Sequence, residues 1–166
     1  MIDQLDKIKS HFGSNLIKRE IAPQISQKLT DEEILILSQI GLSNGVLDFQ
    51  FTDDLCELSE SEIVIGKTLS NNNLILDLES REIKRDGQFF ISKSLKNLII
   101  QLYTYDNLWE NDIPQQKFGN YRKDSNHKKY AKFLETELLK IDENLLKSDN
   151  GLWTSLIEDI EFGIVG

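Results

Sequence analysis

Closely spaced strand signals between residues 47 and 91 constrain the fold of this 166-residue chain more than any other feature. Leu47, Phe49 and Phe51 alternate with polar residues, which is typical of a strand with one buried face. Runs of β-branched and apolar residues between turn residues predict the further strands 63–65, 74–78, 82–84 and 88–91, and Asp86-Gly87 predicts a tight turn between the last two. The intervals are too short for crossover helices, so we expect an antiparallel β-meander.

Apolar residues at helical spacing precede and follow this predicted sheet. We expect one helix over residues 2–12 and another that begins at Thr30, because Thr30 and Glu33 form a capping box. Gly41 ends that helix, since glycine readily adopts the left-handed backbone conformation. The later predictions are helices over 92–102 and 128–146, an exposed loop over 106–127, a break at 148–150 and a closing helix around Trp153. The sequence therefore predicts a single α+β domain over residues 1–166.

Four stretches of this layout, taken in order, carry a resemblance to a known family. They are Leu35-x-x-x-x-Ile40-Gly41-Leu42, Ile63-Val64-Ile65-Gly66, Leu74-Ile75-Leu76-Asp77 and Phe90-Ile91-Ser92-Lys93-Ser94-Leu95-x-x-Leu98. The order resembles the SUKH superfamily, which includes yeast cell-wall regulators and many bacterial immunity proteins. The segment around Trp153 is most similar to the fourth SUKH immunity subfamily. The resemblance implies a SUKH-like α+β fold and, for bacterial members, neutralisation of a cognate toxin, often a nuclease, by binding it.

The distribution of charge favours a protein partner over nucleic acid or a membrane. The formal net charge of −9 repels both nucleic acid and anionic lipid on average. Residues 29–66 contain nine acidic side chains and no lysine or arginine. They are Asp31, Glu32, Glu33, Asp48, Asp53, Asp54, Glu57, Glu60 and Glu62. The run 117–132 reverses the sign and interleaves lysines with aromatic residues, a pattern that can bind nucleic acid, but helix-stripe packing explains it better.

Residue types that carry catalysis or bind metals form no recognisable pattern in this sequence. His11 and His127 lack metal-ligand spacing and are interpreted as ordinary surface residues. Acidic neighbours raise the pKa of a thiol, so Cys56 is interpreted as a structural, buried or semi-exposed cysteine and not as a nucleophile. The scattered glycines form no phosphate-binding loop. We therefore expect neither an enzyme nor a cofactor or metal site.

One cysteine and the absence of long apolar runs also indicate a compartment. Cys56 alone cannot form an internal disulfide, which suits a reducing environment. No apolar run is long enough to cross a bilayer, and residues 1–12 do not resemble a signal peptide. We therefore expect a cytoplasmic protein without a membrane partner.

The predicted binding surface is the acidic strand-and-loop region. Its expected members are Asp48, Asp53, Asp54, Glu57, Glu60 and Glu62, with Trp109 as a separate candidate hot spot. Asp53, Asp54 and Glu57 would hold a cation or face a basic partner, and their spacing lacks the regularity of a calcium loop. The leading hypothesis is an immunity protein that covers the active surface of a basic toxin domain. The alternative is an intracellular scaffold or regulatory module of the same fold.

Overall fold

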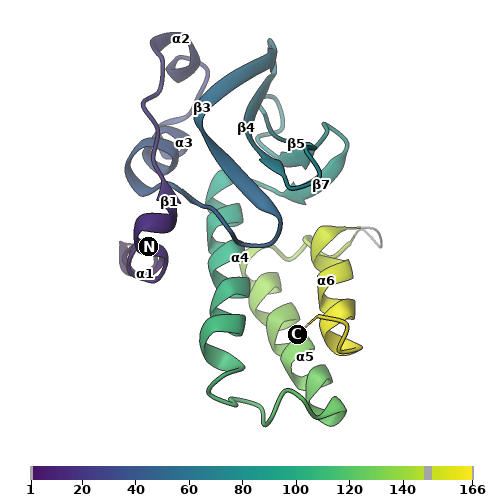
Figure 1. Ribbon diagram of the computed structural model, residues 1–166. Coiled ribbons are helices and arrows are strands. Elements are labelled where there is room, and N and C mark those ends of the chain that lie inside the picture. The colour runs from purple at the N-terminus through teal and green to yellow at the C-terminus, as the bar shows by residue number, and fades with distance from the viewer. Residues whose placement is uncertain (1, 148–150, 166) are drawn as a thin grey trace. The chain divides into compact units, whose positions relative to one another are not determined.

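The computed structural model describes residues 2–147 and 151–165, and the chain divides into two compact units, Met1–Ile99 and Ile100–Gly166 (Figure 1). Within the described residues, the named strands lie in the first unit, and the second is mainly helical. The predicted α+β class with an antiparallel sheet is confirmed. The break predicted at residues 148–150 lies outside the described residues.

A five-stranded antiparallel sheet forms the centre of the first unit, with the strands in sequence order. The strands are β3 (Phe49–Ser59), β4 (Glu62–Thr68), β5 (Asn73–Asp77), β6 (Ile83–Arg85) and β7 (Phe89–Ser92). The turns contain residues with positive φ, among them Asn71 (65°) and Asp86 (50°). Short turns of this kind permit only antiparallel neighbours, as the meander spacing predicts.

The two faces of this sheet are both partly apolar but differ at their margins. One face consists of side chains that are at most 1% exposed: Ile63, Ile65, Leu74, Leu76, Ile83 and Ile91. On the other face, Val64 and Ile75 are also buried (8% and 2% exposed), whereas Leu58 is 52% exposed and Lys67 is exposed. The exposed part of the second face therefore lies along β3 and the adjoining end of β4.

Short helices and a small second sheet precede the meander. The elements are α1 (Ile2–Phe12), η1 (Gly13–Asn15), β1 (Leu16–Ile17), α2 (Pro23–Ser26), α3 (Asp31–Leu35), η2 (Ile36–Ile40) and β2 (Leu42–Ser43). The predicted capping box is confirmed: Thr30 N–H donates to Glu33 Oε2 (2.8 Å), and Glu33 N–H donates to Thr30 Oγ1 (3.2 Å). Gly41 ends the helical segment with φ 92°. A Cβ there would lie 2.9 Å from the Ile17 carbonyl oxygen, so glycine also permits the pairing of β1 with β2.

Two details of the predicted strands are wrong. The strand predicted to include Leu47 begins at Phe49; Leu47 has φ 57° and is half-buried, and Val46 occupies the core instead. Gly66 does not end its strand, because β4 continues to Thr68. Gly66 is instead the point where β4 passes closest to β3, since a Cβ there would lie 2.6 Å from the Gln50 carbonyl oxygen.

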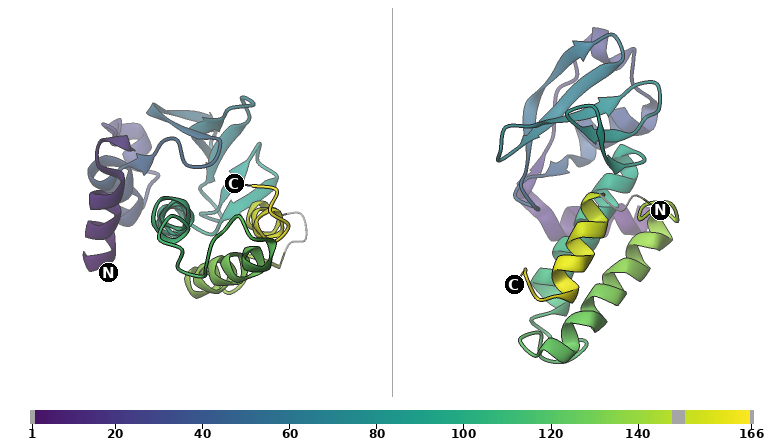
Figure 2. Two further views of the ribbon diagram at one scale, coloured as in Figure 1. Left: turned by 60° about the horizontal axis from the view of Figure 1, so that its bottom comes forward. Right: turned by 90° about the vertical axis from the view of Figure 1, so that its right-hand side faces the viewer.

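Helices make up the second unit. Helix α4 (Leu95–Asn107), which enters the unit at Ile100, continues into a π-helical turn, η3 (Leu108–Asp112). Helices α5 (Asp124–Ile141) and α6 (Leu152–Glu161) follow and lie side by side (Figure 2). The exposed loop predicted from residue 106 is therefore helical as far as Asp112, and the long helix predicted over 128–146 is displaced toward the N-terminus. Within the described residues, no helix is both long enough and apolar enough to span a bilayer.

Candidate protein-binding surface

A long bulge in strand β3, formed by residues 52–55, shapes the acidic surface. Phe51 pairs with Gly66 and Cys56 pairs with Val64, so residues 52–55 lie opposite Ile65 alone. Such an insertion bends a strand and turns its side chains away from the regular alternation. Asp53 and Asp54 lie within this bulge and are exposed. The sequence places them in or beside the connection to Ile63, and the structure places both within β3.

Arg19 is buried beneath the bulge and holds it in place. Its side chain is 4% exposed; Nε donates to the Thr52 carbonyl oxygen (2.6 Å), and Nη2 donates to the Ile65 carbonyl oxygen (3.0 Å). Burial lowers the pKa of the Arg19 guanidinium to about 10, and nearby Asp53 opposes this effect. Arg19 therefore satisfies carbonyl groups that the bulge leaves without strand partners. Sequence reasoning missed this residue, because nothing local marks it.

Asn44 fixes the start of the same bulge. Its Oδ1 accepts from Phe51 N–H (2.5 Å), and its Nδ2 donates to the Phe51 carbonyl oxygen (3.4 Å). Within the bulge, Thr52 Oγ1 donates to the Asp54 carbonyl oxygen (2.8 Å). The hydrogen bonds to Phe51 and Asp54 thus hold the backbone on both sides of Asp53.

The six predicted acidic residues do not form one cluster. Asp48 lies in the turn before β3 and is half-buried, so the prediction that it is an outward strand position is wrong. Glu57 lies in β3, Glu60 lies in the β3–β4 turn, and both are exposed. Glu62 begins β4, is half-buried and accepts from Ser59 Oγ (3.3 Å). The acids are therefore distributed along the length of the β3–β4 hairpin.

Bases from other segments neutralise part of the acidic tract. Lys28 pairs with Glu57 (3.1 Å), Lys96 with Glu32 (2.8 Å) and Arg81 with buried Glu33 (3.0 Å). Among the described residues of the tract, Asp31, Asp48, Asp53, Asp54, Glu60 and Glu62 have no ion-pair partner within 4.0 Å. The surface charge available to a partner comes mainly from these six acids.

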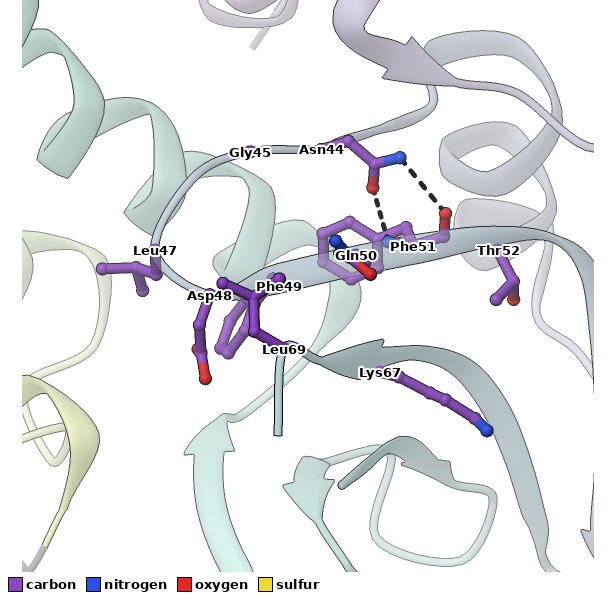
Figure 3. Close-up of a pocket in the computed structure, with 10 residues that line it drawn as sticks. All are labelled: Asn44, Gly45, Leu47, Asp48, Phe49, Gln50, Phe51, Thr52, Lys67 and Leu69. Carbon is purple, nitrogen blue, oxygen red and sulfur yellow. Dashed lines mark hydrogen bonds between the residues drawn. The ribbon is translucent and has the colours of Figure 1, made fainter. Parts of the chain in front are cut away.

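Two hollows lie along β3 and share the residues Asn44, Phe51, Thr52 and Lys67. The first, of about 410 Å³, extends to Asp48 and Leu69 (Figure 3). Asn44 turns toward the backbone of Phe51 there, whereas Asp48, Leu69 and Lys67 project from the chain. The second, of about 770 Å³, is lined by Ile17, Asp53, Asp54, Cys56, Leu58, Val64 and Asn73 in addition to the shared residues. We refer to the two hollows together as the β3 trough.

The cysteine and the histidines occupy different environments from those predicted. Cys56 is exposed in β3 and lines the β3 trough, so the prediction of a buried or semi-exposed structural cysteine is wrong. His11 and His127 are half-buried; the first contacts Phe12 edge-to-face, and the second packs against Tyr121 at 4.7 Å. No group of three or more His, Cys, Asp or Glu side chains in the described chain is arranged to hold a metal ion.

Trp109 belongs to the second unit and packs within an aromatic cluster there. It is half-buried in η3, with ring centroids 6.3 Å from Tyr105 and 5.3 Å from Tyr121. Tyr105 also contacts Trp153, and burial raises the pKa of the Tyr105 hydroxyl. Trp109 therefore contributes to the packing of the second unit, and its role as a hot spot remains a prediction.

A basic hollow of about 470 Å³ lies on the second unit. Its lining includes Phe118, Phe133, Lys128 and Lys132. Lys132 pairs with Glu135 (2.7 Å) and Lys128 with Glu161 (3.7 Å), so the unit's own acids neutralise much of this surface. These ion pairs weaken the interpretation of the basic run as a nucleic-acid surface.

Comparison with known proteins gave no match: no family model, no curated protein and no solved structure is similar to this chain. The resemblance to the SUKH superfamily therefore stays a prediction that depends on the four sequence stretches.

Proposed function

We propose that this chain is a protein-binding module whose β3 face recognises a basic protein surface, and that it acts as an immunity protein for a toxin domain. The observation that carries the proposal is the pair Asp53 and Asp54. Both are exposed on a backbone held by Arg19 and Asn44, and neither has an ion-pair partner within the described chain. Unpaired carboxylates on a fixed strand offer complementary charge without a large cost of ordering.

The chemistry of toxins supports the immunity form of this proposal. A nuclease domain needs a positive cleft for the phosphate backbone. An acidic strand face presents the same sign of charge as that backbone and so competes for the cleft. Long-range attraction accelerates the encounter of opposite charges, and contacts made after docking set the lifetime of the complex.

The test begins with the neighbouring genes: if one encodes a secreted protein with a variable C-terminal domain, that domain is the candidate toxin. We expect co-expression of this chain to restore growth of cells that produce that domain, and the purified proteins to form a complex. A variant with Asp53→Asn, Asp54→Asn and Glu60→Gln should associate several-fold more slowly, with a flatter dependence on salt. Glu57 is left unchanged in this variant, because replacing it would break its ion pair with Lys28.

A control removes two negative charges elsewhere on the same unit. Glu20 and Glu79 are exposed and line neither hollow of the β3 trough, so Glu20→Gln with Glu79→Gln lowers the negative charge without altering the trough. We expect the control to associate almost as fast as the wild type. Equal rates for all three proteins at low salt would exclude the β3 face as the binding surface. A complex with an intracellular protein in place of any toxin domain would favour the alternative scaffold role.

A further inference from the structure

We infer that the β3 trough binds an extended segment of the partner in which an apolar side chain lies between lysine or arginine residues. The apolar side chain packs over Cys56, Leu58 and Val64, and the basic residues approach Asp53, Asp54 and Asp48. This inference rests on the proposed function and specifies the chemistry of the partner.

The floor of the larger hollow is apolar. Phe51 and Val64 are 4% and 8% exposed, so they form its base, whereas Leu58 is 52% exposed and stands at its side. Cys56 pairs with Val64 across the strands and places its thiol on the same face. At about 770 Å³, the hollow falls within the range of ordinary ligand sites, roughly 300–1,000 Å³. Filling it with an apolar side chain would remove exposed apolar surface from water.

The acidic rim lies directly beside this floor. Asp53 and Asp54 line the same hollow as Leu58 and Val64. A segment that seats an apolar side chain over the floor therefore brings its neighbouring residues to the two carboxylates. Side chains alternate along an extended segment, so the residues two positions before and after the anchor share its face and can reach the rim. Lysine and arginine are the side chains that these unpaired carboxylates favour.

The length and charge of the trough favour an extended segment over a single side chain. The smaller hollow continues from Thr52 to Asp48 and Leu69, and Leu69 is 69% exposed (Figure 3). At ~3.3 Å per residue, the strand from Asp48 to Leu58 spans on the order of 30 Å, less the length that the bulge takes up. Lys67 lies where the two hollows meet and donates to Asn71 Oδ1 (3.1 Å). We therefore expect the basic residues of the segment beside Asp48 and beside Asp53 and Asp54, and not opposite Lys67.

Synthetic peptides test the recognition without the partner protein. The probe is a fluorescein-labelled nonapeptide with a central leucine, lysine two residues before and two residues after it, and serine or threonine at the other positions. Two matched peptides carry glutamate in place of lysine, or serine in place of leucine. We expect the first peptide to bind at least tenfold more tightly than either control and to shift the amide resonances of residues 48–58 and 64–67. Equal binding of all three peptides, no binding of the first, or shifts confined to residues 100–166 would overturn the inference.

Variants of the trough floor separate this inference from the proposed function. Cys56→Trp places a bulky ring over the apolar floor of the larger hollow without a change of charge, and Leu58→Ser removes its apolar side; Cys56→Ser is the control for loss of the thiol. We expect the first two to lose at least tenfold in affinity for the probe peptide and for the partner, and Cys56→Ser to bind normally. Far-UV circular dichroism and amide exchange at Ile63–Ile65 establish that each variant is folded.

The outcomes distinguish two failures. If the partner binds Cys56→Trp and Leu58→Ser normally but the acidic-face variant slowly, the β3 face binds by charge alone and the inference is overturned. If no complex with any toxin domain forms while the peptide binds as expected, the immunity proposal fails and the recognition chemistry stands. Dimerisation of the free chain through residues 48–58, measured by sedimentation, would make a second copy the occupant and also overturn the inference.

Discussion

Replacement of Arg19 by methionine tests whether the guanidinium holds the β3 bulge. Methionine preserves the length of the side chain and removes the donors to Thr52 and Ile65. A hydrogen bond from a charged donor contributes about 1.5–3 kcal/mol, so the two close bonds contribute ~3–6 kcal/mol. Burial opposes this: a pKa lowered from 12.5 to about 10 corresponds to ~3 kcal/mol against the charged form. The difference is ~0–3 kcal/mol, and methionine also leaves two carbonyl groups without their donor, so we expect Arg19→Met to lower the free energy of unfolding of the first unit by ~1–3 kcal/mol.

The assay must follow the first unit, because every tryptophan and tyrosine in the chain lies beyond residue 99. Amide hydrogen exchange at Ile63–Ile65 reports directly on the strand that faces the bulge. A loss of about 2 kcal/mol should accelerate that exchange roughly 30-fold, since 1.4 kcal/mol corresponds to a factor of ten. Lys18→Met is the matched control, because Lys18 is exposed and adjacent to Arg19 in sequence. Exchange in Arg19→Met that is unchanged or slower than in the wild type would refute the argument that Arg19 stabilises the bulge.

Two further changes test the sheet itself. Asp77 accepts from Lys84 Nζ (2.8 Å) and from the backbone N–H groups of Ser80 and Glu79, and these bonds hold the pKa of its carboxyl well below the ordinary value. The contribution of Asp77 to stability is complete above the unfolded pKa of about 3.9 and is lost as the pH falls toward the folded pKa. The loss of unfolding free energy in Asp77→Asn, measured by urea unfolding, should therefore shrink between about pH 5 and pH 2. A loss that stays constant over this range would contradict the argument. Gly66→Ala should destabilise the first unit by about 1–3 kcal/mol, because the added Cβ would lie 2.6 Å from the Gln50 carbonyl oxygen. Amide exchange measures this loss. Exchange rates equal to those of the wild type would mean that β3 and β4 separate without cost.

Features whose cause lies within a few residues were predicted correctly. The capping box depends on Thr30 and Glu33, three positions apart, and both of its hydrogen bonds are present. The tight turn at Asp86-Gly87 depends on two residues that adopt positive φ, 50° and 72°. The antiparallel meander follows from the short intervals between apolar runs. Each of these features is a local property, so the sequence alone is sufficient to predict it.

Features whose cause lies far along the chain were not predicted. The segment Asp53-Asp54-Leu55-Cys56-Glu57 lacks a clean alternation, which makes it resemble a loop. It is a strand because β4 pairs with it beyond the bulge and because Arg19, 33 residues before its acceptor Thr52, satisfies the intervening backbone. The helical continuation to Asp112 was missed for a similar reason, since packing of Trp109 against Tyr121 stabilises a polar segment.

The candidate site illustrates the same division. The sequence by itself determined that an acidic tract without bases accompanies the first part of the sheet, because composition and charge depend only on which residues the chain contains. Only the tertiary structure decided which acids remain available: Lys28, Arg81 and Lys96 approach from outside the tract and neutralise Glu57, Glu33 and Glu32. It also decided that exposed Cys56 and Leu58 lie beside Asp53 and Asp54 in one hollow. Coulombic pairing and burial depend on distance in space, and sequence separation does not reveal that distance.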